Sequence, residues 1–343
     1  MVVTRSAAAF LIVLACAAVL AAKPDQPAAK MPAETLLTER LGLPAPAVAR
    51  FRSGEAVVVK VSGTTGHEVA AAGAVRAKGS LRRLVTWLRD IEAFRKASGS
   101  VNVGAISNPV APADFARLSL NDADFSELAA CRPGRCAFRM TSANLARFQK
   151  EVAWKQPQAR DQAVTLAKTL LTEYVAAYQK GGDTALGAYH NQKASNQIAL
   201  DFQDMLRRST KAWDLAHAFV SYLETYPAGK PAGVEERFYW TRDPVGSAPA
   251  LTLHHVVLQE LADGRVLVAD KQFYASREIE TGLLLALGVP NADGSGFDLI
   301  VSVKARAESM GGLAARVMRG RIETAVADTL KVYLEWIRAS AAL

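Results

Sequence analysis

The chain has 343 residues, half of them hydrophobic, and carries a formal net charge of +8 with three cysteines. This length leaves room for a full hydrophobic core in one large domain or two. Beyond the N-terminus no hydrophobic run is long enough to span a bilayer, which excludes a protein with several membrane spans.

Residues 1–22 have the pattern of a secretory signal peptide. A positively charged start precedes an apolar run from Ala7 to Leu20 and a small-residue exit. The apolar run is shorter than the ~20 residues of a membrane-spanning helix, so we expect cleavage and a periplasmic or secreted protein. The alternatives are an uncleaved anchor and a lipoprotein anchored at Cys16, because the sequence before Cys16 loosely resembles a lipobox.

Residues 23–34 are rich in Pro, Ala and Lys and predict a linker. Residues 35–141 predict an N-terminal α+β part, with helical and strand-like periods in alternation. Its expected helices are Thr35–Leu41, Leu81–Lys96 and a short one toward Leu128. Its expected strands are 56–61, 67–76, 101–106 and 115–120.

Residues 142–232 predict a helical insertion, because apolar residues recur at helical spacing throughout. The expected helices are 145–152, 159–180, 195–208 and 211–226.

Residues 233–343 predict an antiparallel meander followed by one long helix, which together complete the α+β domain. The Asp263-Gly264 pair between two β-rich runs is a strong hairpin signal. The expected strands are 234–241, 251–260, 265–275, 279–289 and 297–306, and the helix is 312–339. The predicted fold class is therefore α+β: a curved antiparallel sheet packed on a long C-terminal helix, with an inserted helical layer.

Cys131 and Cys136 flank the sequence Arg-Pro-Gly-Arg. Zinc would need two more ligands, and none lies near in sequence. A redox motif usually has two residues between its cysteines rather than four. Pro133-Gly134 suits the centre of a type II turn, which would bring the cysteines together. We therefore predict a structural disulfide at the corner between the first β region and the helical block.

No other motif specifies a chemistry. The five histidines do not fit any zinc spacing, so we expect no metal, no cofactor and no named catalytic residue. His254 and His255 are neighbours on a predicted strand, so they should face opposite sides, one toward the interior and one toward water. The acidic pairs Glu235-Glu236 and Asp122/Asp124 are expected in solvated turns.

The order of elements resembles the helix-grip fold of the START-like (SRPBCC) superfamily. The resemblance rests on Val57–Val61, on Leu81–Lys96 and on Leu251–Ala339, and the insertion at Ser142–Pro227 departs from that pattern. The Cys-Arg-Pro-Gly-x-Cys segment is also similar to that of secreted bacterial proteins of unassigned function. The START-like resemblance implies a hydrophobic cavity between the sheet and the C-terminal helix. The candidate lining residues are Trp87, Phe238, Trp240, His255, Lys271 and Tyr274.

The leading hypothesis is a non-enzymatic binding protein for a hydrophobic small molecule or lipid. Its positive charge would suit peripheral contact with an anionic membrane, and outside the cytoplasm nucleic acid is not an expected partner. One alternative is an envelope interaction module that uses the helical insertion. A second is a START-like cyclase or hydrolase, for which His255, Lys271 and Tyr274 would be the first residues to test.

Overall fold

The computed structural model describes residues 32–61, 68–189, 197–209, 213, 216–245, 248–277, 279–307 and 315–341. The predicted signal peptide (1–22), the candidate lipid anchor Cys16 and residues 23–31 of the linker lie outside these ranges. From Pro32 to Leu343 the chain forms one compact unit.

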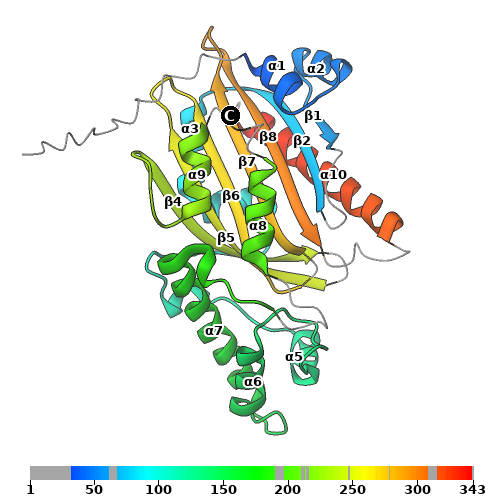
Figure 1. The fold of residues 1–343 in the computed structure, drawn as a ribbon, viewed down its shortest axis with the longest axis vertical. Helices are drawn as coiled ribbons and strands as arrows, with labels where there is room; N and C mark the ends of the chain where they lie inside the picture. Colours follow the sequence, from blue (N-terminus) through cyan, green and yellow to red (C-terminus); the bar gives the residue numbers. More distant parts are fainter. Residues whose placement is uncertain are drawn as a thin grey trace, which may run out of the picture. The chain divides into compact units, whose positions relative to one another are not determined.

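Eight strands of the described chain form one open antiparallel sheet in the order β1-β2-β8-β7-β6-β5-β4-β3 (Figure 1). They are β1 (Val57–Lys60), β2 (Glu68–Lys78), β3 (Val103–Ile106), β4 (Val234–Val245), β5 (Ala248–Glu260), β6 (Val266–Ala275), β7 (Ile279–Pro290) and β8 (Gly296–Ala307). The early strand β2 pairs with the last strand, with Gly73 opposite Val301. The predicted Asp-Gly hairpin joins β5 to β6, where Gly264 has a φ of 84°.

Helices occupy both sides of this sheet in the described chain. They are α1 (Ala33–Thr35), which continues as the π-helix Leu36–Arg40, α2 (Ala45–Arg52), α3 (Leu81–Arg89), α4 (Ile91–Ala97), α5 (Asp122–Ala130), α6 (Ser142–Glu151), α7 (Ala159–Gly181), α8 (Ile198–Arg207), α9 (His217–Thr225) and α10 (Ala315–Ala341). Short 3-10 turns cover Pro112–Phe115 and Gly182–Ala185.

One face of the sheet packs against α3, α4 and α10. Leu330, Leu334 and Ile337 of α10 are buried in one cluster with alternate strand residues such as Val256 and Val301. Gly73 of β2 permits this approach, because a Cβ atom there would stand 2.9 Å from the Leu334 side chain. The long C-terminal helix therefore lies directly on the sheet (Figure 1).

The opposite face packs against helices of the predicted insertion. Tyr178 of α7 stacks on Phe273 of β6 with ring centroids 4.0 Å apart. Trp213, just before α9, donates a hydrogen bond from Nε1 to Ser302 Oγ of β8 at 3.1 Å. In Figure 1, α8 and α9 lie in front of the sheet and α10 lies behind it. The predicted fold class is confirmed: an antiparallel sheet lies between a long C-terminal helix and an inserted helical layer.

Two local predictions were wrong for identifiable reasons. Residues 115–120 form no strand: a 3-10 turn, whose Asp114 carboxylate accepts from the backbone N–H groups of Ser107 and Ala111, ends at Phe115, and the Phe115 carbonyl then accepts from the Leu118 N–H in a further turn. The expected helix 81–96 is broken at Asp90, whose carboxylate accepts from the Ala93 N–H at 3.1 Å and begins α4.

Candidate functional site

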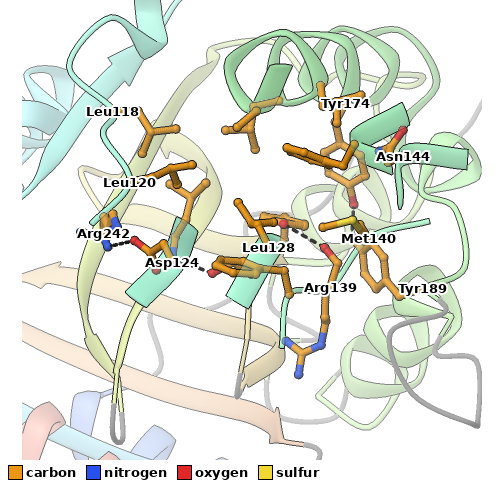
Figure 2. A pocket seen from close by; sticks show the side chains of 18 of the residues that line it. Leu118, Leu120, Asp124, Leu128, Arg139, Met140, Asn144, Tyr174, Tyr189 and Arg242 are labelled. Atoms are coloured by element: carbon orange, nitrogen blue, oxygen red, sulfur yellow. Dashed lines mark hydrogen bonds and ion pairs between the residues drawn. The ribbon is translucent and has the colours of Figure 1, made fainter. Parts of the chain in front are cut away.

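A cavity of about 90 Å³, measured as space open to the centres of water molecules, lies between α5, α6, α7 and the ends of β4–β6 (Figure 2). A single buried water needs roughly 10–15 Å³ on this measure, so the cavity can hold a stretch of hydrocarbon. Its wall is mainly apolar. The apolar lining residues are Leu118, Leu120, Leu128, Phe138, Met140, Phe148, Ala167, Leu170, Leu171, Pro249 and Leu251.

Helix caps and helical spacing position these walls. The Asn121 side chain accepts from the Asp124 N–H and the Asp124 carboxylate accepts from the Asn121 N–H, which together begin α5. The Thr141 hydroxyl likewise accepts from the Asn144 N–H at 3.1 Å and begins α6. Along α7, Ala167, Leu170, Leu171 and Tyr174 fall on one face, because residues three, four and seven positions apart share a side of a helix. Side-chain caps and the apolar face of α7 therefore shape the lobe, by which we mean the part of the molecule formed by α5, α6 and α7.

Tyrosine hydroxyl groups supply part of the polar wall. The hydroxyls of Tyr174 and Tyr189 are 2.6 Å apart, and Tyr174 also donates to the Phe273 carbonyl. Tyr274 donates to the Arg139 carbonyl at 3.0 Å. Burial raises the pKa of Tyr274 to about 12 and also raises the pKa of Tyr174 and Tyr189. These hydroxyls are therefore uncharged at neutral pH.

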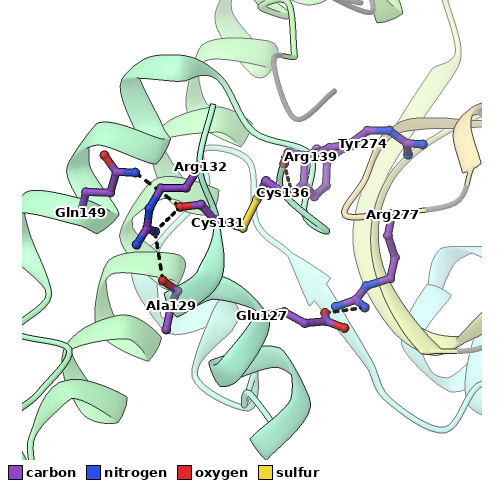
Figure 3. The surroundings of a disulfide bond; sticks show 9 residues. All are labelled: Glu127, Ala129, Cys131, Arg132, Cys136, Arg139, Gln149, Tyr274 and Arg277. Atoms are coloured by element: carbon purple, nitrogen blue, oxygen red, sulfur yellow. Dashed lines mark hydrogen bonds and ion pairs between the residues drawn. A yellow bond between two sulfur atoms is a disulfide. The ribbon is translucent and has the colours of Figure 1, made fainter. Parts of the chain in front are cut away.

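The charged residues at the wall are paired. The Asp124 side chain is 4% exposed, and its carboxylate accepts hydrogen bonds from Arg242 of β4 and from Arg277, the latter at 3.0 Å. Figure 2 shows Arg242 against Asp124. Arg277 also contacts Glu127 of α5 at 2.8 Å (Figure 3). The two carboxylates and two guanidinium groups therefore balance each other. The expectation that Asp124 sits in a solvated turn was wrong.

The predicted disulfide is present beside this cavity. Cys131 and Cys136 are bonded, and Arg132 and Arg135 exchange backbone hydrogen bonds around Pro133-Gly134. Gly134 has a φ of 73°, the positive value that a type II turn requires at its third position. The bond joins the end of α5 to the segment before α6 (Figure 3). Both segments line the cavity, through Leu128 on one side and Phe138 to Thr141 on the other.

Of the six predicted cavity residues, Tyr274 lines this cavity and the others lie elsewhere. Trp87 of α3 packs on Trp336 of α10, with ring centroids 6.1 Å apart. Trp240 lies over Gly104, where a Cβ atom would be 2.4 Å from the indole nitrogen, and its Nε1 donates to the Asp114 carbonyl. These two rings fill packing space on opposite faces of the sheet.

Phe238, His255 and Lys271 lie together under α7, in a buried cluster of aromatic and charged groups. Phe238 stacks on His255 at 4.4 Å, and His255 Nδ1 is 3.1 Å from the Tyr178 hydroxyl. The Lys271 ammonium donates to the Asp183 carboxylate, and these side chains are 1% and 6% exposed. Desolvation lowers the pKa of both His255 and Lys271. The structure therefore brings three predicted residues together in a packed network.

Both neighbouring histidines and the Glu235-Glu236 pair differ in part from expectation. His254 and His255 do face opposite sides of β5, and His255 is buried, but His254 is only 14% exposed rather than open to water, with its Nδ1 2.9 Å from Asp270. Glu235 and Glu236 both lie on β4 rather than in a turn. Burial opposes the ionised form of Glu236, yet hydrogen bonds from His255, Lys230 and Tyr222 hold its pKa at about 2.

The space between the sheet and α10 is occupied by side chains in the described chain, with Leu334 and Ile337 fully buried there. The sequence analysis missed the cavity because the helical spacing of apolar residues in 159–180 does not show whether neighbouring elements fill the space beside that face. One signal for the cavity is present in the sequence. Ala167 and Leu171 make the apolar face of helix α7 wider than a single packed neighbouring element would cover.

No protein-family model, curated protein or solved structure matches this chain. Among the described residues, no group of three or more His, Cys, Asp or Glu side chains could hold a metal ion. None of the described helices is long and apolar enough to cross a membrane.

Proposed function

We propose that this chain is a non-enzymatic binding protein for a lipid-like hydrophobic molecule, and that the cavity between α5, α6 and α7 is its binding site. The observation that carries this proposal is the apolar wall of that cavity beside a few oriented polar groups, which is the usual composition of a small-molecule site. A periplasmic or secreted location is part of the proposal and is supported by the disulfide. Peripheral contact with an anionic membrane is also part of it and is supported by the net charge of +8.

The contacts favour binding over the enzyme alternative. His255 and Lys271, the first candidates for catalysis, are buried against Glu236 and Asp183 rather than at the cavity. Tyr274 does reach the cavity, but its hydroxyl is bonded to a backbone carbonyl. A general acid or base must reach the reacting atoms, and these groups reach their own partners instead.

Filling the cavity provides the test. Ala167 lines it from α7, whereas Ala176 is exposed on the same helix. We expect purified full-length protein to bind the neutral dye N-phenyl-1-naphthylamine with enhanced fluorescence. The Ala167→Trp variant should lose at least about tenfold in affinity, because the indole occupies the space that the ligand needs. The Ala176→Trp variant should bind as the wild type does. Equal affinity for all three proteins, or no dye binding at all, would refute the proposal.

A further inference from the structure

We infer that the ligand is uncharged where it enters the cavity: a neutral amphiphile such as a long-chain alcohol or ester, rather than an ionised fatty acid. This inference rests on the proposed function and concerns the chemical class of its ligand. The charged side chains at the cavity wall, and the partners to which each is bound, support it.

Asp124 and Arg242 of the wall form a charge-compensated cluster with their partners Arg277 and Glu127. Asp124 accepts from Arg242 and Arg277, and Arg277 also pairs with Glu127. Two negative and two positive groups therefore form a neutral cluster. The side chains of Asp124, Arg277 and Arg242 are 4%, 9% and 15% exposed, and both guanidinium groups are bound to Asp124, so a ligand carboxylate would have to compete with this buried partner at either of them.

The remaining charged lining residue, Arg139, points away from the cavity. Its guanidinium group donates to the carbonyl oxygens of Ala275 and Ile279 at the ends of β6 and β7. Figure 2 shows this group turned away from the apolar lining residues, while the Arg139 backbone carbonyl accepts from Tyr274. Arg139 therefore joins two strand ends.

The other polar residues that line the cavity are neutral. They include Thr141 and Asn144 at the start of α6, and Tyr174 and Tyr274. The Asn144 amide can donate to and accept from a ligand hydroxyl or carbonyl, and the tyrosine hydroxyl oxygens, whose protons have protein partners, can still accept. An ionised ligand would lose its hydration here without a free countercharge, which strongly disfavours binding.

Displacement of N-phenyl-1-naphthylamine by 1-dodecanol and by dodecanoate tests this inference. At about pH 7.5 we expect dodecanol to displace the dye at a concentration at least about tenfold lower than dodecanoate. Dodecanoate should gain affinity as the pH falls and its own carboxylate is protonated, whereas dodecanol should not change. This comparison uses the wild-type protein alone.

The Asp124→Asn variant provides a second test, in which affinity for dodecanoate should increase. It removes one negative charge beside Arg242 and Arg277, which leaves their cluster with Glu127 net positive, so dodecanoate should gain about tenfold relative to dodecanol. Asp161→Asn removes the same charge at an exposed position of α7 and should leave the ratio unchanged. Dodecanoate that binds the wild type as tightly as dodecanol at about pH 7.5 overturns the inference but leaves the proposed function intact. If neither compound displaces the dye, or the dye does not bind, the proposed function fails as well.

Discussion

Lys271 and Asp183 are the least exposed oppositely charged pair beneath α7. The Lys271 ammonium lies 3.6 Å from the centroid of the Phe202 ring and 5.2 Å from that of Tyr178. Attraction to Asp183 and to these ring faces offsets the loss of hydration, although burial still lowers the Lys271 pKa. The pair therefore ties the end of α7 to β6, and each partner depends on the other.

We predict that Lys271→Met lowers the free energy of unfolding by about 3–5 kcal/mol, because it leaves the Asp183 carboxylate buried without its partner. The double variant Lys271→Met/Asp183→Leu should recover most of this loss, since neither charge remains. Urea unfolding followed by tryptophan fluorescence measures both values. The exposed Lys150→Met serves as the control and should change stability by less than about 0.5 kcal/mol. A single variant as stable as the wild type would show that the pair contributes nothing.

At the scale of elements, α5 is held at both ends beside the cavity. Near its start, Asp124 is bound by Arg242 and Arg277, and at its end Cys131 is bonded to Cys136. In between, Phe125 packs on Trp154, with ring centroids 5.5 Å apart. The ion pairs and the disulfide therefore keep one wall of the cavity against the other.

Removing the disulfide should affect both stability and binding. The closed loop is short, so we predict that Cys131→Ser/Cys136→Ser lowers the free energy of unfolding by about 2 kcal/mol. It should also weaken N-phenyl-1-naphthylamine binding several-fold, because α5 and the segment before α6 both line the cavity. Val85→Ala, a substitution in the core between α3 and the sheet, destabilises without touching the cavity. Dye affinity that falls equally in both variants would mean that the disulfide acts through stability alone.

For the whole molecule, regular hydrophobic periods made most of the fold predictable. The meander from β4 to β8 and helix α10 follow alternation and helical spacing, and their bounds lie within a few residues of expectation, except for longer starts of β5 and ends of β4. Residues 115–120 were misassigned because a local side chain, Asp114, decided the turn. The alternation of apolar and polar residues in a sequence does not show where a side-chain carboxylate will take the backbone N–H groups that a strand would need.

The candidate site was less predictable, since a cavity depends on which packed faces leave space between them. The disulfide followed from local turn chemistry at Pro133-Gly134. The pairing of Asp124 with Arg242 and Arg277 joins residues more than a hundred positions apart, and no local pattern encodes it. The resemblance to the helix-grip fold directed attention to the sheet and the C-terminal helix, whereas the cavity lies between α5, α6, α7 and the ends of β4–β6.

Photo-crosslinking with a diazirine-bearing long-chain alcohol, followed by mass spectrometric mapping of the labelled peptides, tests this placement most directly. We expect adducts in two segments that line the cavity between α5, α6 and α7, 118–148 and 167–174, and the loss of these adducts in the Ala167→Trp variant. Adducts concentrated in α3, α4 and residues 326–337 of α10 would contradict it, because they would place the ligand between the sheet and the C-terminal helix.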